Sequence, residues 1–483
     1  FEEDFGTSFY TYMLDDWAFT PDYTHDLLHK QFDTNSLKGF GISDLEEGVI
    51  AAGVALHYLN ETQHHQTKHI LSISRIEEEK YVWMDRFTIR NLELFYSPNE
   101  GAKTLIDVLD DTKSAMGSRM LRRWLALPLK NEKQISVRHN IVEQLLTDDK
   151  LSEVLSEEIA KIGDLERLIS KVATQRINPR ECGRLKDALI ALKPIQEICS
   201  ASGKDLQKLT SKINVCESIK ERIANELSDN PPMLLQKGNV IKEGVNTELD
   251  ELRSIQNSGK EYLDKMLERE IERTGISSLK ISFNNIFGYY LEVRNRFKDK
   301  VPEQWIRKQT LVSAERYITE ELKEYEHKIL SAEGRISEIE TQLFSELVQS
   351  IAVHIQQIQL NASIISQLDC LLSFSSIANK HNYSKPNVNN SSDLVIKKGR
   401  HPVIEQQLEM GEPYVPNDVN LNRELQQIMM ITGPNMSGKS ALLRQTALIV
   451  LMAQIGSFVP AKSAEIGLVD KIFTRVGASD NIS

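Results

Sequence analysis

The stretch Gly433-Pro434-Asn435-Met436-Ser437-Gly438-Lys439-Ser440 decides the fold of the C-terminal part of the chain. It fits G-x-x-x-x-G-K-[ST], the pattern of a phosphate-binding P-loop. The short apolar run 427–432 before it predicts a buried strand, and residues 441–455 after it predict a helix that stops at Gly456. A strand, a glycine-rich loop and a helix in this order predict a nucleotide-binding domain.

The residue types of this loop suit a nucleotide that carries Mg²⁺. Gly433 and Gly438 allow backbone angles closed to other residues, so successive N–H groups can turn toward the phosphates. The N-terminus of the following helix adds partial positive charge. We expect Lys439 to reach the β- and γ-phosphates of ATP, and the Ser440 hydroxyl to bind Mg²⁺.

Length and composition exclude several classes of protein. A chain of 483 residues is too long for one ordinary core, so several domains are expected. It has no apolar run long enough to span a membrane, and its net charge of −11 argues against a protein that coats nucleic acid with its whole surface. The cysteines are scattered without a C-x-x-C pair, which predicts buried free thiols rather than a zinc site. They are Cys182, Cys199, Cys216 and Cys370.

The ends of the chain predict that it is a section of a longer protein. It begins at Phe1 without an initiator Met or a signal peptide, and it stops at Ser483 soon after the predicted strand 472–476. The acidic residues after the P-loop, Glu465 and Asp470, do not end an apolar strand. The carboxylates that hold the metal and activate water are therefore expected beyond Ser483.

Residues 1–75 mix short apolar runs with turns and predict a small α/β module. Residues 37–42 read as a strand with its turn, and residues 50–59 as a helix rich in small side chains. His64, His65 and His69 lie in a polar segment without an acidic or cysteine partner at ligand spacing. We interpret them as a solvated loop and not as a metal site.

From residue 76 to 259 the pattern is that of amphipathic helices, with apolar residues three and four apart. A long helix is then predicted at 248–273, and another at 314–378. In the second, apolar residues from Ile318 to Leu347 alternate steps of four and three, the heptad pattern of a helix packed on a partner helix. At 1.5 Å per residue, one unbroken helix of this length is about 90 Å long, so we expect the two helices to form an arm.

Between the two long helices the pattern changes to short strands. Residues 281–284, 289–294 and 310–312 predict a small antiparallel sheet. Eight basic and four acidic residues lie between Ile276 and Ile318, a local charge of +4 on an acidic chain. This favours contact with nucleic-acid phosphates over a merely solvated loop. The expected DNA contacts are Arg294, Arg296, Lys298, Lys300, Arg307 and Lys308.

The residues also carry a family resemblance. Residues 432–440, TGPNMSGKS, resemble the P-loop of the MutS family of DNA mismatch-repair ATPases, usually TGPNM-x-GKS. The resemblance extends through the motifs at 399–402, 472–478, 287–290, 314–317, 321–326 and 116–121. It covers essentially the whole chain, from the middle of the family's connector domain to the first half of its ATPase domain.

This resemblance implies a multidomain α/β and α architecture. The implied order is a connector (1–75), a core or lever of long helices in two segments (76–259 and 320–385), an inserted small β clamp for DNA (260–319), and an incomplete P-loop ATPase domain of ABC type (386–483).

The resemblance also implies function. We expect a protein that clamps double-stranded DNA with mismatches or small loops and couples ATP binding to DNA release or sliding and to repair signalling. ATP or ADP, Mg²⁺, a homodimer, a MutL-type partner and a cytoplasmic, nucleoid-associated location follow from the family. Tyr414 stands at the position of the aromatic residue that stacks on adenine.

Three departures from the family pattern limit what this chain is expected to do alone. The mismatch-reading domain with its Phe-x-Glu wedge is expected ahead of Phe1, and residues 1–3 spell that pattern only by coincidence. The Walker B carboxylates and the switch His are expected beyond Ser483, so no catalytic residue is assigned and hydrolysis by this chain alone is not expected. Ala441 stands where Thr is common in the family.

Three alternatives remain open from the residues. One is a DNA-clamping scaffold that does not hydrolyse ATP, although intact Lys439 and Ser440 argue against a decayed site. Another is a paralogue that acts in recombination, against which the connector-like residues 1–75 speak. A long-armed chromosome ATPase is less favoured, because its coiled coil follows the P-loop whereas the long helices here precede it.

Overall fold

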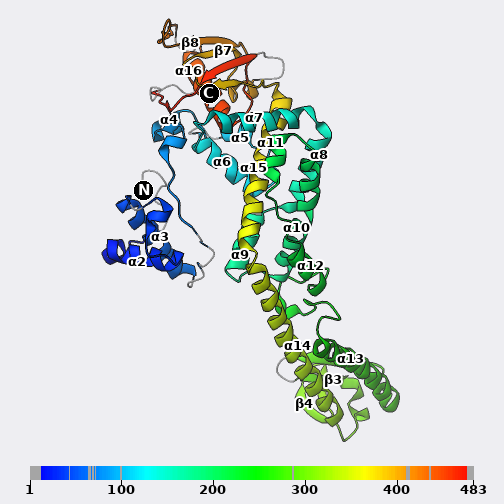
Figure 1. Ribbon diagram of the computed structural model, residues 1–483. Coiled ribbons are helices and arrows are strands. Elements are labelled where there is room, and N and C mark those ends of the chain that lie inside the picture. The colour runs from blue at the N-terminus through cyan, green and yellow to red at the C-terminus, as the bar shows by residue number, and fades with distance from the viewer. Residues whose placement is uncertain are drawn as a thin grey trace. The chain divides into compact units, whose positions relative to one another are not determined.

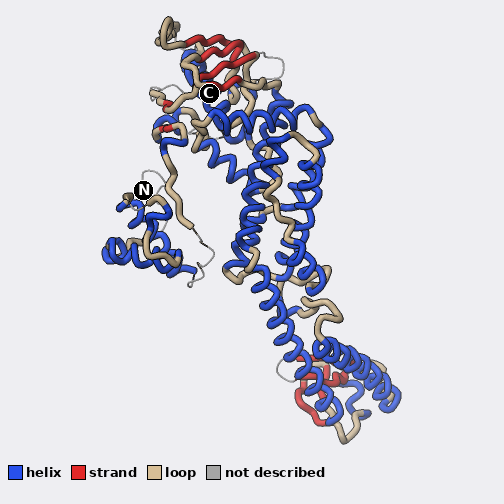
Figure 2. The backbone as a smooth tube through the Cα atoms, viewed as in Figure 1, coloured by secondary structure: helices blue, strands red, loops and turns tan. Residues whose placement is uncertain are grey.

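The structure is a computed structural model and describes residues 12–42, 44–63, 67, 70, 72–97, 101–284, 288–408, 414–434 and 437–475. Within these residues helices predominate and three small sheets are present, so the predicted mixed α/β and α class is confirmed (Figures 1 and 2). The chain divides into two compact units. The first comprises 1–176, 187–216 and 353–483, and the second 177–186 and 217–352.

The N-terminal section is built from two helices, α2 (Pro21–Phe32) and α3 (Glu46–Gln63), with short 3-10 helices η1 (Asp16–Phe19) and η2 (Leu37–Phe40). α2 and α3 pack closely, because a Cβ at Gly53 would lie 2.4 Å from the Cβ of Thr24. The predicted helix at 50–59 is confirmed. His64, His65 and His69 lie outside the described residues.

The predicted strand at 37–42 is wrong. Residues 37–40 form η2, which Ser36 caps by accepting a hydrogen bond from Lys38 N at 3.2 Å. Gly41 ends it with a left-handed φ of 69°, a conformation that suits glycine. Leu37 and Ile42 are buried in the α2–α3 core, so the apolar spacing reflects packing on helices. The described residues of this section contain no strand, and an α/β module is not found among them.

A buried helix, α15 (Ile355–His381), organises the helical part of the first unit. It packs against α5, α6, α7, α8 and α9, and almost every residue from 358 to 378 is at least half-buried (Figure 1). A helix that is buried on all sides lies at the centre of a core. The other helices here are α4 (Arg86–Asn91), α5 (Leu105–Leu109), α6 (Ala115–Ala126), α7 (Glu132–Thr147), α8 (Asp149–Ile162), α9 (Leu165–Ala173) and α11 (Lys204–Thr210).

One buried carboxylate joins α15 to the start of α6. Asp369 is fully buried and accepts hydrogen bonds from Lys113 N at 2.8 Å, Ser114 N at 2.9 Å and Ser114 Oγ at 2.7 Å. Burial raises its pKa, and these hydrogen bonds oppose that rise. A Cβ at Gly117 would lie 2.2 Å from Asp369 Oδ2, so a glycine is needed for this close approach.

The C-terminal section contains a four-stranded sheet in the order β6-β9-β7-β8. β6 (Asn387–Asn389) runs parallel to β9 (Ser463–Gly467), whereas β7 (Leu394–Gly399) is antiparallel to both β9 and β8 (Asn417–Leu421). A second, two-stranded sheet pairs β1 (Trp83–Met84) with β10 (Lys471–Ile472) in parallel. Of the predicted strand 472–476, only Ile472 belongs to a strand, and Val476 is outside the described residues.

The helix after the P-loop is confirmed as α16 (Lys439–Ile455), which ends at Gly456 in a left-handed conformation with φ 96°. The predicted buried strand before the loop is wrong. Residues 427–432 pair with no strand in the described part of the chain, and Ile428 and Met430 are 84% and 86% exposed. A strand needs a partner for its backbone groups, and none of the described residues supplies one for this segment.

The second unit contains the pair of long helices α13 (Thr247–Thr274) and α14 (Glu320–Ala352). The rings of Tyr262 and Tyr325 stack between them at 3.7 Å, and Arg253 donates to the buried Glu340 at 2.5 Å. The predicted heptad pattern of α14 is confirmed by the burial of its apolar positions. These include Leu322, Ile329, Ala332, Ile336, Ile339 and Leu347.

A four-stranded antiparallel sheet packs on these two helices, in the order β2-β3-β5-β4. Its strands are β2 (Lys280–Asn284), β3 (Gly288–Arg294), β4 (Ile306–Thr310) and β5 (Ala314–Ile318), with the 3-10 helix η5 (Asn295–Lys300) after β3. The predicted strands at 281–284 and 289–294 are confirmed. The third differs, because β4 ends at Thr310 and Leu311 and Val312 lie in the turn to β5.

The prediction of one unbroken helix from 314 to 378 is wrong. Residues 314–318 form β5, and Val353 and His354 form a turn between α14 and α15. Val353 is 79% exposed, and the sequence around it contains neither Gly nor Pro. The break reflects tertiary packing. α14 buries one stripe against α13, whereas α15 is surrounded by other helices.

The remaining elements are short or carry no predicted site. They are η3 (Glu78–Lys80), α10 (Pro179–Ser200), α12 (Glu217–Glu226), η4 (Leu235–Lys237) and η6 (Ile404–Gln406). All four cysteines are buried with free thiols, as predicted. Among the described helices, none is both long and apolar enough to cross a membrane.

Candidate functional site

The described part of the P-loop lies at the N-terminus of α16. Gly438 has a left-handed φ of 83° and is followed directly by Lys439, the first residue of the helix. The Lys439 ammonium folds back over the loop and donates to Gly433 O at 2.9 Å and Pro434 O at 2.5 Å. Gly433, Pro434, Ser437, Gly438, Lys439 and Ser440 are therefore brought together, while Asn435 and Met436 lie outside the described residues.

The far end of α16 is fixed by a cation from α7. Arg138 donates to Ile455 O at 2.6 Å, and a Cβ at Gly456 would lie 2.4 Å from the Arg138 Cβ. A positive charge at a helix C-terminus is favourable because the last carbonyls carry partial negative charge. The buried Gln454 adds hydrogen bonds to Leu129 O at 2.8 Å and Val469 O at 3.0 Å. The helix that presents the P-loop is therefore firmly attached to the helical core.

A buried ion pair holds the middle of α16. Arg444, 7% exposed, donates to the Glu93 carboxylate at 3.2 Å, just after α4. His401 lies beside this arginine, and its Nδ1 accepts from Val403 N at 3.3 Å and Ile404 N at 3.2 Å. Burial, together with the charge of Arg444, lowers the pKa of His401 to about 3. His401 is therefore neutral at neutral pH, and Arg444 connects the P-loop helix to the segment that follows α4.

Tyr414 lies against the second turn of α16. Its hydroxyl donates to Gln445 Oε1 at 2.9 Å, and Gln445 is fully buried. The Tyr414 side chain is half-buried, and burial raises its pKa. A Cβ at Gly399 would lie 2.7 Å from Gln445 Nε2, so the glycine of the 399–402 motif gives Gln445 its space.

The six basic residues predicted as DNA contacts all lie on the four-stranded sheet or on η5, and all are exposed. Lys298 and Arg307 share one carboxylate, Glu315, at 2.8 Å and 3.5 Å. Arg296 and Lys300 instead flank the ring of Phe297, at 4.5 Å and 5.8 Å from its centroid. Among the described residues, Arg294, Arg296, Lys300 and Lys308 have no carboxylate partner.

Glu315 is the electrostatic centre of this sheet. It is 2% exposed, and its hydrogen bonds from Lys298 and then from Tyr317 lower the pKa of its carboxyl. A buried charge must be paired to be tolerated. Lys298 and Arg307 therefore stabilise the sheet as well as contribute surface charge, whereas the other four basic residues leave their charge unpaired by a carboxylate of the described residues.

Three residues that position the helix after the P-loop were not found by sequence reasoning, namely Glu93, Arg444 and Gln445. Arg444 and Gln445 are polar residues in a helix that is mostly apolar and largely buried, which is a signal of a buried polar contact. Glu93 carries no such signal, because its partner is more than three hundred residues away in the sequence.

Comparison with known families matches three parts of the chain. MutS domain II matches residues 7–71, MutS domain III residues 87–375, and MutS domain V residues 429–483. MutS domain III alone covers more than half of the chain. A helical core with an inserted small sheet, followed in the chain by a P-loop region, is the arrangement that these three matches describe. The chain belongs to the MutS family.

Relatives agree over the whole chain. It is 58% identical to a DNA mismatch repair protein MutS of Christiangramia forsetii and 57% identical to one of Bacteroides thetaiotaomicron. A third, of Flavobacterium psychrophilum, is 58% identical. In each case all of this chain is covered but only 56% of the relative, so the chain spans about half the length of these proteins.

Proposed function

We propose that the whole protein is a DNA mismatch-recognition ATPase that clamps mismatched duplex DNA and couples ATP binding to DNA release or sliding and to repair signalling. The single observation that carries this proposal is the P-loop at the N-terminus of α16, with Lys439 over the loop. The sequence TGPNMSGKS at this place is far more specific than a general phosphate loop. Identity above half over the whole chain to proteins named DNA mismatch repair protein MutS supports it.

For the nucleotide site, we propose that ATP or ADP binds with its phosphates at residues 433–440. Lys439 would exchange its two carbonyl contacts for the β- and γ-phosphates, and Ser440 would bind Mg²⁺. Tyr414 would face the adenine. The hydrolytic carboxylates are assigned to no residue of this chain.

For DNA, we propose that the sheet of the second unit is the clamp, within domain limits 260–319. Its basic residues would contact phosphates without reading sequence. Arg294, Arg296, Lys300 and Lys308 are the stronger candidates, because Lys298 and Arg307 already share Glu315. The connector would occupy 1–75, the core 76–259 and 320–385, and the ATPase domain 386–483.

The proposal includes partners and location. Each ATP site would be completed by a second subunit of a homodimer, and a MutL-type protein would act downstream. The substrate would be double-stranded DNA with mismatches or small loops, in the cytoplasm at the nucleoid. Coupling of two ligands through one protein is reciprocal, so DNA must change nucleotide affinity by the factor by which nucleotide changes DNA affinity.

Equilibrium binding to two duplexes tests this proposal. The full-length protein is titrated at fixed salt with a duplex that carries one mismatch and with its matched counterpart, with and without ATP. We expect tighter binding to the mismatch, and an effect of ATP that Lys439→Ala removes. Equal binding to both duplexes with no effect of ATP would contradict the proposal and favour a scaffold that clamps DNA passively.

A further inference from the structure

The residue that follows the end of α4 has an unusual backbone conformation. Glu93 has a left-handed φ of 50°, which residues other than glycine rarely adopt. Its N–H donates to Arg90 O at 3.0 Å, and the N–H of Leu94 donates to Ile89 O at 3.3 Å. These are the two hydrogen bonds of a Schellman motif, in which the residue at the position of Glu93 is usually glycine. A glutamate there is unfavourable for the backbone, so we expect its side chain to make a compensating contact.

That contact is the ion pair with Arg444 of α16. Arg444 Nη1 lies 3.2 Å from Glu93 Oε1, and the two side chains are 8% and 21% exposed. Among the described residues, Glu93 is the one carboxylate paired with this guanidinium, and Arg444 Nε has no hydrogen-bond partner. The buried positive charge of Arg444 therefore depends on Glu93 for its counter-charge.

Arg444 lies on the face of α16 that carries Ser440. The two residues are four positions apart, so they lie on the same side of the helix and about 6 Å apart along its axis. A rotation of α16 about its axis would move both side chains together. The ion pair with Glu93 opposes this rotation, and it therefore fixes the direction in which α16 presents Ser440.

The segment that carries Glu93 is itself anchored to two other parts of the first unit. Thr88 is fully buried, and its Oγ1 accepts from Thr474 N at 3.0 Å, just after β10. Asn91 Nδ2 donates to Thr474 O at 3.3 Å. Glu93 O accepts from Leu105 N at 3.1 Å, at the start of α5. The carboxylate that contacts α16 therefore stands on a segment held by the end of β10 and by α5.

We propose that Glu93 is a positioning residue for the nucleotide site, because it holds Arg444 and with it the face of α16 that carries Ser440. This inference rests on the proposed function, in which residues 433–440 bind the phosphates and Ser440 binds Mg²⁺. Glu93 acts through Arg444. Its effect is specific to the metal-bound nucleotide, since the residue whose direction it fixes is the ligand of the metal.

Equilibrium titration of the full-length protein with AMP-PNP, a non-hydrolysable ATP analogue, tests the proposal in the presence of Mg²⁺ and in EDTA. Glu93→Gln removes the charge. Glu93→Gly removes the side chain and also relieves the left-handed backbone, so it keeps the test available if Glu93→Gln does not fold. We expect both variants to weaken binding about tenfold with Mg²⁺ and about twofold or less in EDTA. Thermal unfolding checks that each variant is folded.

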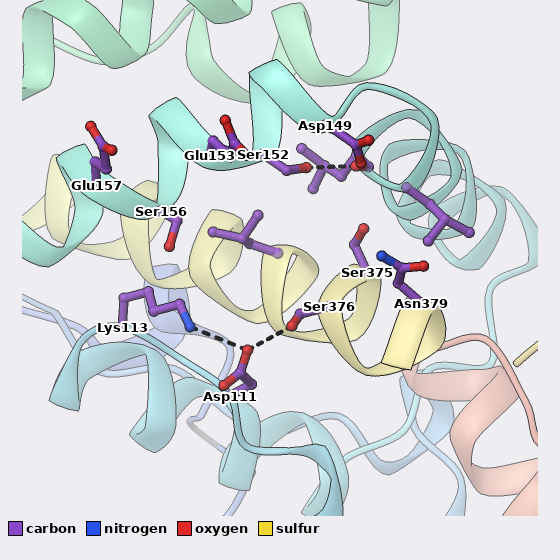
Figure 3. A pocket seen from close by; sticks show the side chains of 13 residues that line it. Asp111, Lys113, Asp149, Ser152, Glu153, Ser156, Glu157, Ser375, Ser376 and Asn379 are labelled. Atoms are coloured by element: carbon purple, nitrogen blue, oxygen red, sulfur yellow. Dashed lines mark hydrogen bonds and ion pairs between the residues drawn. The ribbon is translucent and has the colours of Figure 1, made fainter. Parts of the chain in front are cut away.

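The chain offers two matched controls. Gln175 follows α9 with a left-handed φ of 54°, so Gln175→Gly relieves a similar backbone at the end of a different helix. Asp111 Oδ2 lies 3.2 Å from Lys113 Nζ, the same distance as in the Glu93 pair, and it also accepts from Ser376 of α15 (Figure 3). We expect Gln175→Gly and Asp111→Asn to leave the affinity for AMP-PNP unchanged in both conditions.

Three outcomes would contradict the inference. Wild-type affinity in both Glu93 variants would overturn it and leave the proposed function standing, provided that Lys439→Ala has lost AMP-PNP binding. An equal loss with Mg²⁺ and in EDTA would also overturn it, because the ion pair would then support the loop without directing Ser440. Failure of the wild-type protein to bind AMP-PNP would contradict the proposed function itself, and this inference with it.

Discussion

Two apolar segments with similar patterns, 289–294 in the sheet that we propose as the clamp and 427–432 before the P-loop, adopt different structures. In the clamp, Leu291 and Val293 are fully buried, and β3 pairs with β2 and β5, both within about thirty residues in the sequence. In the second segment Ile428 and Met430 are exposed, and no described strand pairs with it. The two segments share an apolar pattern, and the difference between them is that only 289–294 has partner strands among the described residues.

Truncation of one apolar side chain in each region gives the largest expected contrast. Leu291→Ala leaves a cavity in the core of the clamp, which should lower the free energy of unfolding by about 2–5 kcal/mol. Ile428→Ala removes an exposed side chain and should change it by about 0.5 kcal/mol or less. Chemical denaturation of each variant, monitored by hydrogen exchange of peptides from each region, measures the change in the free energy of unfolding. An equal loss in the two variants would mean that Ile428 is buried.

Removal of one partner of an ion pair should give the next largest difference in stability between the two regions. Glu93→Gln leaves Arg444 buried without a counter-charge, and we expect a loss of about 3 kcal/mol in the first unit. Arg307→Gln in the clamp should cost much less, because Arg307 is 61% exposed and Lys298 still pairs with Glu315. Thermal unfolding of each variant measures the difference. A smaller loss for Glu93→Gln than for Arg307→Gln would contradict the assignment of the ion pair.

The two regions should also lose stability in different pH ranges. The pKa of His401 falls from 6.5 to about 3 on folding, so unfolding takes up a proton between these values. The contribution of His401 to the free energy of unfolding is therefore fully present above its unfolded-state pKa. It decreases by about 2 kcal/mol as the pH falls from 7 to 5. His139, whose pKa burial lowers to about 4, adds to this loss in the first unit. The pKa of Glu315 is also lowered on folding, so its carboxylate stabilises the folded state above the unfolded-state pKa of 4.5. That contribution is lost only as the pH falls below 4.5.

Unfolding at a series of pH values, with hydrogen exchange to resolve the regions, measures these ranges. His401→Asn should flatten the dependence of the P-loop region between pH 7 and pH 5, and Glu315→Gln that of the clamp at lower pH. The assignment of His401 would be wrong if its replacement left the first profile unchanged.

The same contrast explains how much the sequence could predict. Some features follow from local rules. A glycine ends the helix after the P-loop at Gly456, and the apolar stripe of α14 indicates a helix that packs on one partner helix. The break at Val353 and His354 could not be predicted, because no residue there disfavours a helix and only the change of packing partners produces it. The prediction of a helix over the residues of β5 was wrong for a similar reason, because the strand is formed by pairing with β3 and β4.

The candidate sites divide in the same way. The P-loop residues are contiguous in sequence, so their pattern alone placed them together. The Glu93–Arg444 pair depends on a contact between residues far apart in the sequence. Lys298 and Arg307 are close to Glu315 in the sequence, but a count of charges does not show which cations are already paired.

The smallest expected effect concerns DNA binding by the clamp. Lys308→Ala should weaken affinity for any duplex sequence by about 1 kcal/mol and reduce the slope of binding against salt by about one. Lys298→Ala should have a smaller effect on the slope, because Lys298 pairs with Glu315. Titrations of a labelled duplex at several salt concentrations measure both. A larger change in slope for Lys298→Ala would show that the internal pair does not compete with DNA.

The central claim is that the nucleotide at Lys439 acts on DNA held by the clamp. The most direct measurement is the rate at which the full-length protein leaves a mismatched duplex after ATP is added. Lys439→Ala is the test variant, and Lys462→Ala is a control at a lysine outside the P-loop. We predict that ATP changes the rate in the wild type and in Lys462→Ala but not in Lys439→Ala. The same response to ATP in all three proteins would contradict the account.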